Sequence, residues 1–161
     1  MKIFNAFSKV AFLTFLLMAF VFVSCKDDDD DDVTTPVEKN EIIGKWQLTS
    51  ITPQTAGSTI TGLELIPVLA PCVYDLKFTF TADNKVTLSD CPAAVTLIGT
   101  FIKVENTTTW KVETGKLTLT NGSTSNSFGL VQNPKDMQII VNTNTTGSGP
   151  AANAVMSLKR L

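Results

Sequence analysis

The sequence contains no histidine among its 161 residues. This absence excludes Ser-His-Asp and Cys-His catalysis, histidine metal sites and imidazole general bases. Carboxylates do not take over these roles, because Asp75, Asp90, Glu105 and Glu113 fall on outward strand positions or in loops and form no recognisable pair. We therefore expect a protein that is not an enzyme, with no catalytic residue, no metal site and no cofactor.

Charged residues are also few, at 17% of the chain, and the formal net charge is only −2. One aspartate run accounts for the acidic excess, because residues 33–161 carry ten basic and nine acidic side chains. Proteins that bind nucleic acid present a basic patch or stripe to the phosphates, and this count leaves no such excess. We therefore expect no nucleic-acid partner.

The one strongly hydrophobic segment is short. It covers the 14 residues 10–23 and follows two lysines. A membrane-spanning helix needs about 20 apolar residues, so residues 1–24 are predicted to be a signal peptide. The end of this segment, Phe22-Val23-Ser24-Cys25, resembles a bacterial lipobox, which implies that Cys25 receives lipid on its sulfur and becomes the first residue after cleavage. The alternative is simple secretory cleavage that leaves Cys25 as an unpaired thiol.

A dense acidic segment follows this cysteine. It consists of Lys26 and six aspartates, Asp27, Asp28, Asp29, Asp30, Asp31 and Asp32. Like charges at this density stay solvated, so residues 25–40 are interpreted as a tether and linker. The run also resembles the export signals of Bacteroidota surface lipoproteins, which implies a lipid-anchored protein of the outer membrane that is exposed at the cell surface. The alternatives are a plain spacer on the periplasmic face and a calcium site, which consecutive aspartates disfavour because they lack the spacing of a calcium loop.

Residues 41–161 are expected to form one all-β domain. Apolar and polar side chains alternate there in short runs, which is typical of half-buried antiparallel strands. The apolar positions are Trp46 and Leu48; Tyr74, Leu76, Phe78 and Phe80; Val86 and Leu88; Trp110 and Val112; Leu117 and Leu119; Phe128 and Leu130; Met137, Ile139 and Val141; and Met156 and Leu158. Eight strands, or nine if residues 95–104 add one, predict an antiparallel up-and-down β-barrel, with a two-sheet β-sandwich as the alternative. Residues 63–69 are predicted to form a short helix or lid at the barrel mouth.

Several motifs in this domain resemble a known family. They are Gly44-Lys45-Trp46, the hairpin Phe78-Thr79-Phe80-Thr81-Ala82-Asp83-Asn84, the run from Thr109 through Thr120, and the ending Met156-Ser157-Leu158-Lys159-Arg160-Leu161. Together they resemble the lipocalin-like domain of Bacteroidota lipoproteins, over residues 42–161. The resemblance implies a calycin-type barrel, while ligand carriage in the true lipocalins is an analogy of fold and does not fix the function.

The ends of the barrel sequence suggest how it closes. In a closed meander the first and last strands run antiparallel, so Trp46, near Gly44, is expected to face Arg160. A guanidinium over an indole ring contributes about 0.5 to 2 kcal/mol and would seal this end of the barrel. Gly44, Trp46 and Arg160 are therefore predicted to close the barrel, with ligand binding by Trp46 or Arg160 as the alternative.

Two cysteines flank one predicted hairpin. An exported protein can form disulfides, and we expect Cys72 and Cys91 to be paired. A two-residue turn at Asp83-Asn84 would set Cys72 opposite Val95, so the chain after Cys91 must fold back for the bond to form. The alternative is two free thiols.

Two functions remain open. In the first, the barrel binds a small apolar or amphipathic molecule in a cavity lined by Tyr74, Phe78, Phe80, Trp110, Phe128, Met137 and Met156. In the second, the same side chains fill the barrel, and its loops dock a protein partner in the cell envelope. The sequence does not decide between them.

Overall fold

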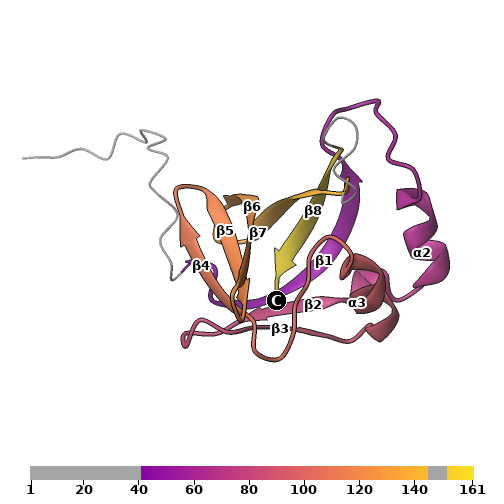
Figure 1. The fold of residues 1–161 in the computed structure, drawn as a ribbon. Helices are drawn as coiled ribbons and strands as arrows, with labels where there is room; N and C mark the ends of the chain where they lie inside the picture. The colour runs from indigo at the N-terminus through magenta and orange to yellow at the C-terminus, as the bar shows by residue number, and fades with distance from the viewer. Residues whose placement is uncertain (1–40, 145–151) are drawn as a thin grey trace, which may run out of the picture. The chain divides into compact units, whose positions relative to one another are not determined.

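Eight antiparallel strands form one sheet in the part of the chain that the structure describes (Figure 1). The computed structural model describes residues 41–144 and 152–161. The strands are β1 (Gly44–Pro53), β2 (Lys77–Phe80), β3 (Val86–Ser89), β4 (Thr109–Glu113), β5 (Lys116–Asn121), β6 (Thr124–Gln132), β7 (Asp136–Asn142) and β8 (Asn153–Arg160). The predicted signal peptide, the lipid site at Cys25 and the acidic run 26–32 lie outside the described residues. No described helix is long and apolar enough to cross a membrane.

The sheet closes on itself almost completely. Its strand order, β3-β2-β1-β8-β7-β6-β5-β4, is that of an up-and-down meander whose first and last strands pair. The two edge strands meet at a bridge between Lys85 and Thr109, and the N–H of Trp110 donates to the carbonyl of Asn84 at 2.8 Å. The fold is therefore the predicted all-β barrel and not the alternative two-sheet sandwich.

Short helices cover one side of the barrel. The lid segment predicted at 63–69 is helical, as η2 (Leu63–Leu65) followed by α2 (Ile66–Leu69), and η3 (Val73–Asp75) precedes β2. The optional ninth strand at 95–104 is wrong, because α3 (Pro92–Ile98) takes up the first part of that segment. A proline at the first helical position and two buried residues four apart, Ala94 and Ile98, favour a helix there. In Figure 1, α2 and α3 lie next to each other.

The hairpin between β2 and β3 differs from the prediction. Phe80 pairs with Val86, so the connection is the five-residue loop 81–85 and not a two-residue turn. The hydroxyl of Thr81 donates to the carbonyl of Lys85 at 3.0 Å, which closes this wider loop. Because pairing stops at Lys77 and Ser89, both flanking chains are free to turn toward each other.

Those flanking chains meet in the predicted disulfide. Cys72 and Cys91 are bonded, with their Cα atoms 5.5 Å apart. Cys72 immediately precedes η3 and Cys91 immediately precedes α3. The bond therefore ties the helical segment between β1 and β2 to the start of α3.

One end of the barrel is sealed by the arginine that the sequence predicts. Arg160 pairs with Trp46 across β1 and β8, and its guanidinium carbon lies 4.2 Å from the centroid of the indole ring. The guanidinium also donates to the carbonyls of Ile43 (2.8 Å), Pro134 (2.7 Å) and Glu41. The indole N–H of Trp46 donates to the carbonyl of Ile42 at 2.8 Å. This group of contacts joins the chain before β1, the β6–β7 loop and the end of β8.

We expect Gly44→Ala to destabilise the fold more than Gly57→Ala. Both glycines have positive φ, +140° and +77°, so both substitutions strain the backbone by about 1 to 3 kcal/mol. A Cβ at position 44 would also lie 2.7 Å from Nη1 of Arg160, whereas one at position 57 meets nothing within 4 Å. Urea unfolding, followed by tryptophan fluorescence, measures the difference. Equal losses would mean that Arg160 moves aside freely and is not held rigidly.

We expect the double substitution Cys72→Ser with Cys91→Ser to lower the free energy of unfolding by about 3 kcal/mol, because the bond closes a loop across a sequence separation of 19. Urea unfolding with and without reductant measures this loss. Reductant should destabilise the parent protein and leave the double variant unchanged. Intact mass after alkylation without reductant should show neither Cys72 nor Cys91 modified, and labelling of both would refute the bond.

Candidate functional site

Most of the side chains predicted to line a cavity are instead packed in the core. Phe78, Phe80, Trp110, Met137 and Met156 are each at most 3% exposed, and Phe128 is 7% exposed. The rings of Phe80 and Trp110 meet edge to face with centroids 5.7 Å apart. The indole N–H of Trp110 also donates to the carbonyl of Lys85 at 3.0 Å. These residues therefore build the interior of the barrel and hold its two edge strands together.

The strand position predicted for Tyr74 is wrong. Alternation predicts an inward strand position, but its side chain is 41% exposed and lies in η3. The chain after Pro71 forms a helical turn, in which the N–H of Asp75 donates to the carbonyl of Cys72 at 2.8 Å. A helical turn buries residues three apart, here Val73 and Leu76, so the alternation of a strand starts only at Lys77.

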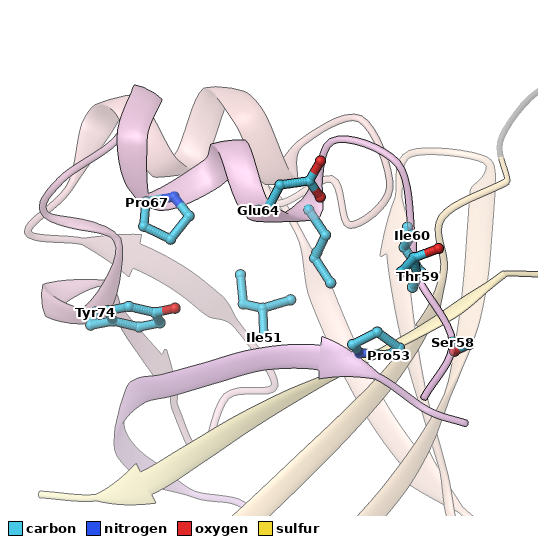
Figure 2. Close-up of a pocket in the computed structure, with 9 residues that line it drawn as sticks. Ile51, Pro53, Ser58, Thr59, Ile60, Glu64, Pro67 and Tyr74 are labelled. Carbon is cyan, nitrogen blue, oxygen red and sulfur yellow. The ribbon is translucent and has the colours of Figure 1, made fainter. Parts of the chain in front are cut away.

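A pocket lies where Tyr74 points, between the end of β1 and the helical segment above it (Figure 2). We call it the lid pocket. Its volume is about 290 Å³, and its lining residues are Ile51, Pro53, Ser58, Thr59, Ile60, Leu63, Glu64, Pro67 and Tyr74. Ile51 and Pro53 come from β1, and the others come from the connection between β1 and β2. The pocket is therefore mainly apolar, with hydroxyl groups and one carboxylate.

A β-bulge aims Ile51 into this pocket. Leu48 pairs with Leu158, but the next pair is Ser50 with Ser157, so Thr49 is an extra residue in β1. Its hydroxyl donates to the carbonyl of Ser157 at 2.9 Å. Because cross-strand partners share a face, the shift puts Ile51 opposite buried Met156, on the inner side of the barrel.

Hydrogen bonds to backbone carbonyls hold both sides of the lid pocket in place. On one side the amide of Gln47 donates to the carbonyl of Tyr74 at 2.7 Å, and the nearby disulfide at Cys72 restrains the same turn. On the other side the N–H of Gln54 donates to the carbonyl of Asn153 at 2.8 Å, and the hydroxyl of Ser58 donates to the carbonyl of Thr55 at 2.7 Å. The pocket is therefore built into the fold.

Two described carboxyl groups have a shifted pKa, and both lie away from the lid pocket. The hydroxyl of Thr81 lowers the pKa of Asp83, and the hydroxyl of Ser89 lowers the pKa of Asp90, which also pairs with Lys77 at 3.4 Å. Both carboxylates lie at the surface, and neither lines the lid pocket. Among described residues, no group of three histidine, cysteine or carboxylate side chains could hold a metal ion.

A second, more polar hollow lies beside the loop after α3. Its volume is about 460 Å³, and Phe101 and Phe128 meet Lys103, Asn126 and Asn142 there. Two of the residues predicted to line a cavity therefore border a pocket: Tyr74 lines the lid pocket, and Phe128 lines this separate hollow.

Sequence reasoning missed the lining residues Ile51, Pro53 and Glu64. One signal was present, because the alternation that begins with Trp46 and Leu48 skips an extra residue before Ile51 and Pro53. A skipped residue of this kind indicates a bulge. No sequence pattern predicts that Glu64 lines the pocket, because its position depends on how the loop folds over β1.

Comparison with known proteins is consistent with this geometry. No curated protein and no solved structure matches the chain. The family model of the lipocalin-like domain matches residues 42–146, which is more than half of the chain. A barrel of this kind suggests small-molecule binding in general, and the family is typically a non-enzymatic binding fold. The chain therefore belongs to the family of lipocalin-like domains.

Proposed function

We propose that the domain binds a small apolar or amphipathic molecule in the lid pocket. The observation that carries this proposal is the pocket itself, an apolar hollow at the opposite end of β1 from the seal made by Trp46 and Arg160. Its volume is near the lower limit of ligand sites, which is about 300 Å³, so the ligand is small. Hydroxyl groups of Ser58, Thr59 and Tyr74 line the same space and offer partners for a polar end.

This site differs from the one that the sequence predicted. A ligand among Phe78, Phe80 and Met156 would have to displace side chains that are already fully buried. Displacing a dense core loses dispersion contacts, which a small ligand would have to restore. Binding at the mouth of the barrel avoids this cost.

A second candidate function is the docking of a protein partner in the cell envelope through the loops. The densely packed interior favours it, and so do Val68 and Leu69 of α2, which are 71% and 61% exposed. In this case the lid pocket would bind no small molecule of its own. The next experiment separates the two candidates.

We expect 1-octanol to bind the full-length protein in phosphatidylcholine nanodiscs saturably, in a ratio near one to one, beyond its uptake by empty nanodiscs. Ile51→Trp should weaken this binding by at least about tenfold, because the larger ring fills the lid pocket. Val131→Trp is the control, since Val131 is 56% exposed and does not line the pocket. Isothermal titration calorimetry measures the affinities.

Thermal unfolding of each variant verifies that it is folded before its affinity is compared. If the parent protein takes up no more octanol than empty nanodiscs, the binding function is wrong and docking through the loops remains. Equal weakening by both tryptophan substitutions would place the binding elsewhere than in the lid pocket.

We also propose that Cys25 anchors the chain to the outer membrane through lipid, with the domain at the cell surface. Support comes from the lipobox-like Ser24-Cys25 and from the acidic run that follows. Several acyl chains together hold a protein on a bilayer, because each buried methylene contributes about 0.8 kcal/mol. The six aspartates are assigned to export toward the outer leaflet.

We expect cells that express the protein to incorporate labelled fatty acid into it, and Cys25→Ala to abolish the label. Replacing all six aspartates at 27–32 with alanine should keep the label but protect the domain from protease added to intact cells. Label that persists in Cys25→Ala would overturn the anchor. Unchanged protease sensitivity of the aspartate variant would show that the acidic run is only a spacer.

A further inference from the structure

The lid pocket carries a negative charge at its rim. Among the described side chains that line it, Glu64 alone carries a formal charge. None of the ion pairs between described residues involves Glu64. Residues 46–76, which include every lining residue of the pocket, contain no lysine or arginine. The pocket therefore has an acidic rim without a counter-charge nearby in the sequence.

An aromatic ring lies in the same pocket. Tyr74 is held in place by the hydrogen bond from Gln47 to its carbonyl and by the disulfide two residues before it. Figure 2 shows Tyr74 and Glu64 on different sides of the space into which Ile51 points. The face of an aromatic ring is electron-rich and attracts cations but not anions.

These features together select for the charge of a ligand. An apolar floor of Ile51, Pro53 and Leu63 favours a short hydrocarbon body. A carboxylate and an aromatic ring at the rim both favour a positive charge at the end of that body. An anionic amphiphile such as a fatty acid would meet repulsion from Glu64 and find no basic partner among the lining residues.

We propose that the lid pocket selects a cationic amphiphile, a molecule with a small alkyl or aryl body and one ammonium group. The inference rests on the proposed function and adds the class of ligand to it. Glu64 lies at the exposed surface, so its attraction is screened by solvent and the expected preference is moderate. Glu64 is a residue that determines specificity, while Ile51 and its apolar neighbours supply most of the affinity.

The test compares three probes that share an eight-carbon chain: octylammonium, 1-octanol and octanoate. Calorimetry on the full-length protein in phosphatidylcholine nanodiscs, with empty nanodiscs subtracted, gives each affinity. We expect octylammonium to bind about three- to tenfold more tightly than octanol, and octanoate to bind more weakly than octanol. Raising the salt concentration from 20 to 500 mM should shrink the preference for octylammonium, because salt screens exposed charges.

Glu64→Gln should remove most of the preference for octylammonium over octanol and leave only the part that the Tyr74 ring contributes. Glu113→Gln is the matched control, because it removes the same charge from an exposed glutamate that pairs with Lys111 outside the pocket. Tyr74→Leu should reduce this preference in part, because it removes the aromatic ring.

The outcomes distinguish this inference from the function on which it rests. If octanol binds and octylammonium binds no more tightly, or if the preference is undiminished in Glu64→Gln, the cationic selectivity is wrong and the binding function stands. If Glu113→Gln removes the preference as well, only the net charge of the protein matters, and the inference is wrong. If none of the three probes binds, the proposed function and the inference fail together.

Discussion

The contact between Arg160 and Trp46 holds the two halves of the barrel in register. β1 begins the N-terminal hairpin and β8 ends the C-terminal meander, and these strands pair from Trp46–Arg160 to Pro53–Ala154. A guanidinium that stacks on an indole and donates to three separate carbonyls fits only one register, because a one-residue slip would turn every side chain of the strand to the other face. This contact lies at one end of the paired strands β1 and β8. The other end, near Ile51 and Pro53, borders the lid pocket.

That far end becomes a site because the register is broken once. From Trp46 the alternation runs inward through Leu48, and the bulge at Thr49 then adds one residue. Without it, Ile51 would point away from the barrel and the segment at 54–75 would cover a polar strand face. With it, the apolar floor of the lid pocket is continuous with the core at Met156. The contact between Arg160 and Trp46 thus fixes which side chains of β1 point inward at the start of the strand. The bulge at Thr49 shifts this alternation by one residue where the lid pocket begins.

The sequence predicts features that follow from repetition along the chain, and much less of what depends on single residues. Alternation predicts most of the strands, the closed meander and the pairing of Trp46 with Arg160. The bond between Cys72 and Cys91 is predicted from the hairpin that they flank and from export. The strand position predicted for Tyr74 and the optional strand at 95–104 are wrong, because helical and two-residue periods compete there over a few positions. The lid pocket was missed because Glu64 and Pro67 reach β1 through a loop whose path no local pattern specifies. The candidate site is thus the least predictable part of the domain.

Stability and selectivity are separated in this barrel. The aromatic and aliphatic interior is already closed by its own side chains, so changes there act on the free energy of unfolding. The lid segment contributes few buried residues, Ile66, Ala70 and Val73 among them, and it is attached by the disulfide and by hydrogen bonds to β1. Exchanging an exposed lining residue such as Glu64 therefore alters the charge of the pocket without disturbing the core. Under the proposed function, the composition of the lid, more than that of the barrel, would determine which ligand is preferred.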